Sequence, residues 1–521
     1  MKRHTHTLLA VLLLAPLAAL HAAELKLAAV FSDHMVLQRD KAVPIWGWAD
    51  PGEQVTVVFA NQKKTAATDT NGKWLVKLDP LSASADPLTM TVSGAIESRT
   101  LTIGDVLVGE VWLGSGQSNM GVSVGGALDF EKEAAAANLP LIRMLREDSK
   151  TAETPQANAT GAWVVCSPKT VGGFSAVLYF FGRELHRELK VPVGLINSSL
   201  GDTAIQSWIA ADEQAKIPEL KAGLDADVKA DAAIDWAGAT ARYEQALASW
   251  KEKAAQAKAA GQRPSNPPCD PLEVRNRRGS LRGGGLFNGK IAPLIPLAMR
   301  GVVWYQGESN TRPAEAGRRY ALQLPLLIRD WRTRWGKELP FASVQLANYI
   351  PWPPGSYPGW PLVREAQLKS LRLPHTGMAV AIDIGEPNNI HPKNKQDVGK
   401  RLALWALGDV YGKKVPATSG PLPAGHEVSG SNLIVTFTHA EGGLLAKAGD
   451  LKGLVIAGAD QQWKPAQARI EGDKVIVSSP AVPKPVAVRY AWSENPECNL
   501  YNGAGLPASP FRTDDWQVSD K

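Results

Sequence analysis

The sequence predicts an α/β protein in which a body with a parallel sheet lies between two β-rich regions. The chain has 521 residues, which is more than one hydrophobic core of about 250–300 residues usually serves. From residue 106 to about 412, apolar strand-like runs alternate with amphipathic helical patterns. This alternation favours a parallel sheet covered by helices on both faces. On either side of this body, short apolar runs are separated by turn residues.

The N-terminus has the pattern of a signal peptide over residues 1–22. Basic residues at positions 2 and 3 precede an apolar run over residues 8–20, which is too short to span a bilayer. Small residues follow, and we expect cleavage after Ala22 or Ala23. No later segment resembles a membrane anchor. The sequence therefore predicts a periplasmic or secreted protein.

The two flanking regions, residues 23–105 and 413–521, are expected to be β-sandwich-like. In the first region, runs at 55–59 and 74–78 are bounded by Asp-Pro-Gly at 50–52 and Asn-Gly at 71–72. Such turn signals at intervals of about ten residues are typical of small sandwiches. The second region repeats this pattern with Gly- and Pro-rich turns. Neither region carries an obvious reactive motif.

The body over residues 106–412 is expected to hold a catalytic domain interrupted by a helical insertion at about 210–275. The insertion is rich in Ala, Lys, Glu and Asp, and its Trp236 and Trp250 are expected to be local packing anchors. The strands expected in the body are 106–113, 141–145, 193–197, 302–305, 342–346 and 379–384. The helices expected there are 174–189, 320–335, 362–371 and 395–407.

Composition and charge exclude several classes of protein. The net charge of +6 is small for this length and is not gathered into one run, so we expect no nucleic acid or anionic membrane as partner. Cys166, Cys269 and Cys498 allow at most one disulfide and lack the spacing of metal ligands, so we expect a structural role for them. No phosphate-cradling lysine motif or zinc-peptidase motif is present. Neither nucleotide hydrolysis nor zinc-peptidase chemistry is therefore supported by the sequence.

Polar loops that follow the predicted strands point to a nucleophile and a base. Ligands of open α/β sheets bind beyond the carboxyl ends of the strands. Ser118 follows the first strand, and His391 follows the sixth in a polar loop. A serine attacks an acyl carbon only when a base takes its proton, so these two residues are the candidate pair. The backbone amides of Ser118 and Gly201 would stabilise an oxyanion, with a side-chain amide from Gln306 or Asn310 completing the hole.

The same loops resemble the motif blocks of the SGNH hydrolases, in particular the sialate O-acetylesterase-like carbohydrate esterases. The similar segments are Gly-Gln-Ser-Asn-Met at 116–120, Trp-Tyr-Gln-Gly-Glu-Ser-Asn at 304–310 and Ile-His-Pro at 390–392, followed by Lys395 and Gln396. The resemblance implies a flavodoxin-like catalytic domain that hydrolyses acetyl esters of sugars without metal or cofactor. It also implies the nucleophile role for Ser118 and the base role for His391, with Gly201 in the oxyanion hole.

The acidic member of the triad remains open at this point. Many SGNH hydrolases have an aspartate three residues before the histidine, but this chain has Asn388 there. Asp383 is slightly favoured to orient His391, and Glu308 is the alternative, although a glutamate in that turn is as well suited to capping the backbone. A Ser–His dyad supported by a backbone carbonyl is the third option.

An aromatic loop after the fifth strand suggests a glycan subsite. The chain has 17 Trp residues, and aromatic faces pack on the apolar faces of sugar rings. Trp352, Tyr357 and Trp360 are the expected substrate-binding residues, with the alternative that they only pin a Pro-rich loop to the body. The predicted function is an exported carbohydrate O-acetylesterase that uses an acyl-enzyme. Its substrate would be sialic acid or a plant polysaccharide such as xylan, xyloglucan or pectin. The alternatives are a non-catalytic glycan-binding protein and a general short-chain esterase.

Overall fold

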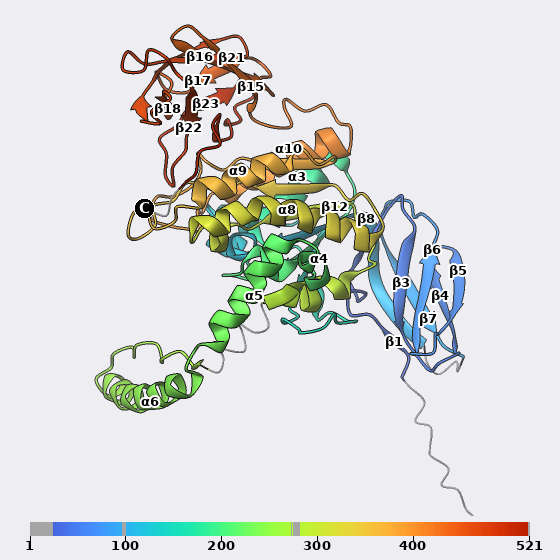
Figure 1. Cartoon of the computed structure of the whole chain (residues 1–521). Coiled ribbons are helices and arrows are strands. Elements are labelled where there is room, and N and C mark those ends of the chain that lie inside the picture. The colour runs from blue at the N-terminus through green and yellow to red at the C-terminus, as the bar shows by residue number, and fades with distance from the viewer. Residues whose placement is uncertain (1–23, 96–99, 272–273, 275–281, 519–521) are drawn as a thin grey trace, which may run out of the picture.

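The computed structural model describes residues 24–95, 100–271, 274 and 282–518 (Figure 1). The expected signal peptide, residues 1–22, lies outside the described residues, as do residues 272–273 and 275 at the end of the expected insertion. In the part of the chain that is described, no helix is long and apolar enough to cross a membrane.

The body is built on a parallel sheet, which confirms the α/β prediction. Its strands lie in the order β10-β9-β11-β8-β12-β13-β14, and all neighbours are parallel except the edge strand β10. Counted from β8, the strands β8, β11, β12, β13 and β14 have the order 2-1-3-4-5 of flavodoxin-like sheets. The bounds are β8 (Thr100–Gly116), β9 (Ile142–Glu147), β10 (Gly161–Val165), β11 (Val193–Ser199), β12 (Gly301–Tyr305), β13 (Phe341–Val344) and β14 (Thr376–Ala379).

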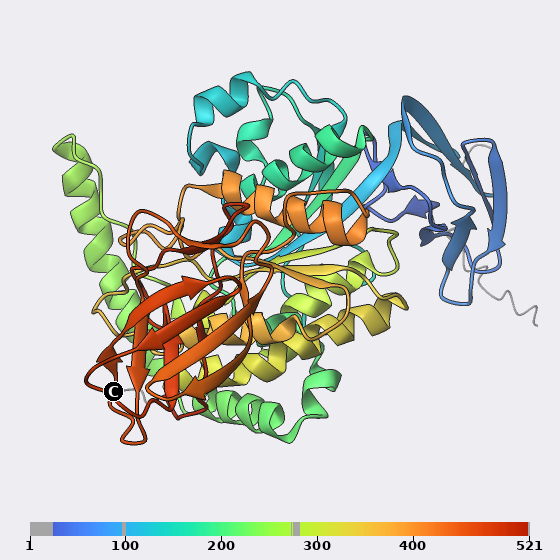
Figure 2. The same ribbon diagram turned by 90° about the horizontal axis from the view of Figure 1, so that it is seen from above.

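Helices cover both faces of this sheet, as Figure 2 shows from above. On one face α3 (Ala176–Leu189) packs against α10 (Lys395–Trp405), and on the other α8 (Ala314–Trp335) packs against α9 (Trp360–Ser370). Because side chains alternate along a strand, β12 serves both layers. Val302 and Trp304 join the core that contains α8 and α9, whereas Val303 and Tyr305 join the core that contains α3 and α10.

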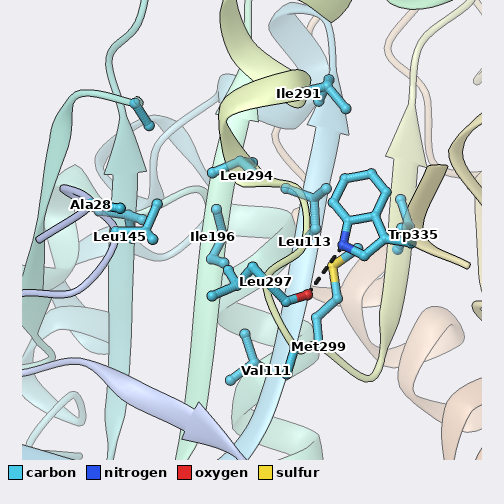
Figure 3. Close-up of a cluster of buried hydrophobic side chains, with 14 of the residues drawn as sticks. Ala28, Val111, Leu113, Leu145, Ile196, Ile291, Leu294, Leu297, Met299 and Trp335 are labelled. Atoms are coloured by element: carbon cyan, nitrogen blue, oxygen red, sulfur yellow. Dashed lines mark hydrogen bonds between the residues drawn. The ribbon is translucent and has the colours of Figure 1, made fainter. Parts of the chain in front are cut away.

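Apolar side chains from distant segments close the core on the α8 side (Figure 3). Leu113 of β8 and Ile196 of β11 contribute to it, together with Leu297 and Met299 from the segment before β12. The indole Nε1 of Trp335, at the end of α8, donates to the Leu297 carbonyl at 3.1 Å. The buried indole is thus satisfied as well as packed.

The N-terminal β region is continuous with the body through β8. The first half of β8 pairs with β2 (Val36–Gln38) and β7 (Ser84–Ser93), and β7 pairs with β4 (Gln54–Phe59). The expected boundary between residues 105 and 106 therefore lies inside a strand. Asp105 has a left-handed φ of 54°, and the β7–β8 register shifts nearby, so the strand bends there. The remaining strands are β1 (Lys26–Leu27), β3 (Val43–Trp48), β5 (Gln62–Ala67) and β6 (Lys73–Leu78).

The segment expected to form the insertion is helical. It contains α4 (Ala211–Ala215), α5 (Pro218–Ala232) and α6 (Trp236–Ala259). Figure 1 shows α6 standing away from the body, and among its 24 residues, all of them described, only Ala254 is buried. The indole Nε1 groups of Trp236 and Trp250 donate to local carbonyls, those of Asp231 at 3.2 Å and Ser265 at 2.9 Å.

The C-terminal region is all β, and its two four-stranded sheets share one core. Leu433 and Val477 from the first sheet pack with Ile456, Val488 and Phe511 from the second. The first sheet holds β15 (Leu422–Ser429), β16 (Asn432–Thr438), β20 (Gln467–Glu471) and β21 (Lys474–Ser478). The second sheet holds β18 (Leu454–Ala457), β19 (Lys464–Pro465), β22 (Ala487–Tyr490) and β24 (Phe511–Arg512), and a separate pair is formed by β17 (Leu444–Ala446) and β23 (Leu500–Asn502).

The three cysteines are unpaired. Cys166 is buried, Cys498 is half-buried and Cys269 is exposed. Burial raises the pKa of the Cys166 thiol to about 12 and that of Cys498 to about 11, so both thiols stay protonated. The structure thus has no bridge of the kind that the sequence left open.

Candidate active site

The loop that carries Ser118 begins where three parallel strands end together. Gly116, the last residue of β8, lies opposite Ser199 of β11 on one side and Tyr305 of β12 on the other. Its φ is 131°, and a Cβ at this position would lie 2.1 Å from the Tyr305 carbonyl oxygen. Only glycine fits such a close approach of two backbones. The chain then turns into the short helix α1 (Ser118–Gly121) and presents Ser118 at the carboxyl edge of the sheet.

The structure brings Ser118 and His391 together. The Oγ of Ser118 and the Nε2 of His391 are 2.7 Å apart, although 273 residues separate them in the sequence. Asn389 stiffens the histidine loop, since its Oδ1 accepts from the His391 amide at 3.0 Å and its Nδ2 donates to the His391 carbonyl at 2.9 Å. Burial, and secondarily the charge of Lys395, lower the pKa of His391. A neutral imidazole at this distance can accept the serine proton.

Gly201 also lies beside Ser118. A Cβ built on Gly201 would be 3.4 Å from the Ser118 Cβ. The preceding amide, that of Leu200, donates to the Gly116 carbonyl at 3.1 Å and ties the two loops together. The backbone of Gly201 therefore lies beside the candidate nucleophile.

Gln306 does not have the role expected of it. Its side chain is fully buried, and its Nε2 donates to the Thr203 carbonyl at 3.0 Å and to the Asn310 Oδ1 at 2.8 Å. Both N–H groups are thereby used, so Gln306 supports the loop behind Gly201 and cannot also bind an oxyanion. Asn310 has one bond from its Nδ2, to Gln206 Oε1 at 3.2 Å, and stays a candidate donor.

The prediction that Asp383 orients His391 is wrong. Its carboxylate pairs with the guanidinium of Arg401 at 2.7 and 2.8 Å and accepts from the Tyr501 hydroxyl at 3.1 Å. Within the described residues it has no hydrogen bond to His391. The reason is that Asp383 lies just after β14, beside α10, where a bidentate arginine partner is within reach.

Glu308 does not contact His391 either. Its Oε1 accepts from the Asn119 Nδ2 at 2.6 Å, and its Oε2 has no partner among the described residues. The side chain is 8% exposed, and burial raises its pKa. Across the described ranges, the Nδ1 of His391 has no hydrogen-bonding carboxylate. The geometry is that of a Ser–His pair without a direct acidic partner.

The three aromatic residues of the loop after β13 have different positions. Trp352 is 87% exposed. Tyr357 is half-buried and stacks on Trp360 with ring centroids 5.9 Å apart and planes at 16°. Trp360 is 2% exposed, and its Nε1 donates to the Ala347 carbonyl at 3.0 Å. Trp360 is thus a core residue, and its prediction as a substrate-binding residue is wrong.

Two residues near Ser118 were not singled out from the sequence as part of the site. Asn119 and Lys395 are buried and bonded to each other, with Oδ1 and Nζ 2.6 Å apart. Both lie in the segments that carried the family resemblance, which was the available signal. Among the described residues, no group of three His, Cys, Asp or Glu side chains could hold a metal ion.

Comparison with known proteins identifies the class. Residues 289–407 match the family described as carbohydrate esterase, sialic acid-specific acetylesterase. The mouse sialate O-acetylesterase is 30% identical over 93% of this chain and 94% of its own, and the rat enzyme is 29% identical over the same shares. A crystal structure of a carbohydrate acetylesterase from Xanthomonas citri is 37% identical, covers 94% of this chain and 100% of its own, and superposes with a TM-score of 0.78.

These similarities make the protein a carboxylic-ester hydrolase of the carbohydrate esterase class, with acetyl esters as its substrates. The chain belongs to the sialate O-acetylesterase family.

Proposed function

We propose that the protein removes acetyl groups from saccharides through a serine acyl-enzyme, with Ser118 as nucleophile and His391 as general base. The observation that carries this proposal is the 2.7 Å distance between Ser118 Oγ and His391 Nε2. It argues against a non-catalytic glycan-binding protein, which would have no need to hold a hydroxyl against a desolvated imidazole. The flanking β regions, residues 23–105 and 413–521, are proposed as sandwich units around the catalytic body of residues 106–412.

The reaction follows from these positions. Ser118 Oγ attacks the acetyl carbonyl carbon while its proton passes to His391 Nε2. The negative charge on the carbonyl oxygen is stabilised by the backbone amides of Ser118 and Gly201, with the Asn310 Nδ2 as third donor. The ester C–O bond breaks, and the sugar oxygen takes the proton from His391. Water then attacks the acetyl-serine with His391 again as base. The bond between the acetyl carbon and Ser118 Oγ breaks, Oγ takes the proton back from His391, and acetate leaves.

The substrate is proposed to be an acetylated sialic acid or an acetylated plant-type saccharide. Trp352 supports this, because an indole that is 87% exposed offers an apolar face to a sugar ring. The pattern over residues 1–22 supports export to the periplasm or outside the cell. A general short-chain esterase is the alternative, and it would have no use for the exposed indole.

The first experiment compares wild type with Ser118→Ala on 4-nitrophenyl acetate and on a panel of acetylated glycans. Loss of the nucleophile should lower kcat by about 10³-fold or more. Ser429→Ala is the matched control, since Ser429 is exposed on β15. If Ser118→Ala keeps activity within about tenfold of wild type while both variants stay folded, the acyl-enzyme mechanism is excluded.

Replacing Trp352 with Ala tests the sugar-binding face. We expect KM for an acetylated oligosaccharide to rise about tenfold, which corresponds to about 1.4 kcal/mol of stacking. KM for 4-nitrophenyl acetate should not change, because this substrate has no sugar ring to pack on the indole. An equal loss on both substrates would instead assign Trp352 to loop structure.

A further inference from the structure

A buried polar cluster adjoins the Ser118–His391 pair through the residues next to each of them in the sequence, Asn119 and Ile390. Lys395 is 0% exposed, Asn119 is 2% exposed, and Glu308 closes the cluster on the side of β12. The Asn119 side chain lies at the centre of the cluster and forms hydrogen bonds through both its oxygen and its nitrogen. Its Oδ1 accepts from Lys395 Nζ at 2.6 Å, while its Nδ2 donates to Glu308 Oε1 at 2.6 Å and to the Ile390 carbonyl at 2.9 Å.

These bonds connect the two halves of the site. Asn119 is the neighbour of Ser118, and Ile390 is the neighbour of His391, so one side chain sets the spacing between the serine loop and the histidine loop. Lys395 begins α10 and holds the Asn119 oxygen. With Oδ1 fixed, the amide plane cannot flip, and Nδ2 must face Glu308 and Ile390.

We propose that Lys395, acting through Asn119, is a positioning residue that holds Ser118 and His391 at hydrogen-bonding distance. The inference rests on the proposed function. Lys395 would supply part of the positioning that the carboxylate of a catalytic triad usually provides. This carboxylate is missing here, since His391 Nδ1 has no carboxylate partner in the described part of the chain. The Lys395 ammonium also interacts with the His391 imidazole, and its positive charge disfavours protonation of that ring.

The surroundings of Lys395 explain why its charge acts on His391. The titratable groups whose charges interact with Lys395 are Glu308, Glu386 and His391, and the centroid of the Tyr305 ring lies 5.1 Å from Nζ. Burial lowers the pKa of Lys395 to about 7, and the two glutamates oppose this shift. Below that pH the ammonium is charged and lowers the pKa of His391, so the base stays neutral further into the acid range.

The test compares Lys395→Met with Lys395→Gln on 4-nitrophenyl acetate. Methionine removes both the hydrogen bond and the charge, whereas glutamine keeps an N–H donor for Asn119. We expect kcat of Lys395→Met to fall about 100-fold with KM within about twofold, and Lys395→Gln to recover about tenfold of that loss. The acid limb of the kcat/KM profile should move to higher pH in both variants, because the pKa of His391 rises when the nearby charge is gone.

Lys393→Met is the matched control, since Lys393 is exposed on the same loop and, within the described part of the chain, its hydrogen bonds involve only its backbone amide and carbonyl. It should leave kcat and the acid limb unchanged. If Lys395→Met does not fold, Lys395→Gln alone decides through the pH profile. If Lys395→Gln has the kcat and the acid limb of wild type, Lys395 has no positioning role. If Ser118→Ala is inactive in the same assay, the proposed function still holds. Activity retained by Ser118→Ala would overturn the proposed function instead.

Discussion

The two β regions that flank the body contact it at opposite ends of the parallel strands. The N-terminal region is attached through β8 itself, at the amino end of the sheet. The C-terminal region instead contacts the loops at the carboxyl end, near Ser118 and His391. Its Tyr501 bonds to Asp383 at 3.1 Å, and its Glu494 accepts from the amides of Gly355 and Tyr357 at 3.0 and 2.8 Å.

This difference separates a role in stability from a role in catalysis. Strand pairing in β8 stabilises the body without reaching the site. The bonds from Glu494 hold the loop that carries Trp352, and Ile350 of the same loop donates its amide to the Pro387 carbonyl in the histidine loop at 2.8 Å. Changes at the C-terminal contacts should therefore alter turnover, and changes at the N-terminal contacts should alter only stability.

The largest effect is expected from Arg364→Met. This guanidinium is fully buried on α9 and bonds only to carbonyl oxygens, two in the body and two in the C-terminal region: those of Leu346, Ala347, Ser493 and Glu494. Its loss removes the donor of the Leu346 and Ser493 carbonyls, whereas those of Ala347 and Glu494 keep the Trp360 Nε1 and the Tyr349 amide. Two buried carbonyls without a donor should lower the free energy of unfolding by about 3 kcal/mol or more. We also expect kcat to drop about tenfold in the folded protein, because the loops around the site lose their support.

Urea unfolding and kcat measured on the same preparation check this, with Arg372→Met as control because Arg372 is exposed at the end of α9. A stability loss with unchanged kcat would mean that the C-terminal region resembles the N-terminal one in its role.

A smaller, purely structural effect is expected from Arg143→Met. Arg143 of β9 is almost buried and pairs with Asp105 at 2.7 Å, at the bend of β8, where Asp105 also lies 2.6 Å from His34 Nδ1. Removing it leaves Asp105 with one partner fewer and should cost about 2 kcal/mol in the free energy of unfolding. Because this contact is at the amino end of the sheet, kcat should stay within about twofold of wild type. A fall in kcat without a fall in stability would break the comparison.

The smallest effect is expected from Tyr501→Phe. This change removes one hydroxyl bond to Asp383 and leaves the Arg401 pair in place. A neutral donor to a charged acceptor outside the reacting groups should change kcat by about two- to threefold, with little change in Tm. Asp383→Asn is the companion variant, since it weakens the same contact from the other side. A larger fall in kcat for Tyr501→Phe than for Asp383→Asn would show that Tyr501 acts on the site by another route.

The sequence could predict what depends on local pattern. Ser118, Gly201 and His391 each follow a strand, and parallel strands bring the loops after them to one edge. Asp383 could not be assigned correctly, because its bond to Arg401 depends on how α10 packs against the sheet. Trp360 was misassigned for a similar reason: the Pro-rich pattern of its loop does not reveal which aromatic ring turns inward.

The role of the C-terminal region was equally hidden, since its contacts are single side chains that bond to backbone or side-chain groups more than 100 residues away. Arg364 and Ser493 are 129 positions apart in the chain, and Tyr501 and Asp383 are 118 apart. No periodicity marks such pairs. The fold is therefore easier to predict than the bonds that align its loops.

The 17 residues of β8 have a consequence for how this architecture can be inherited. A module joined by a linker can be lost or exchanged by recombination without harm to its neighbour. Here a cut at the bend near Asp105 would divide one strand and separate β2 from residues 107–109 of β8, with which it pairs, so an edge of the N-terminal sheet would be left unpaired. The N-terminal region and the body must therefore be transmitted together, and their lineages should share a single history.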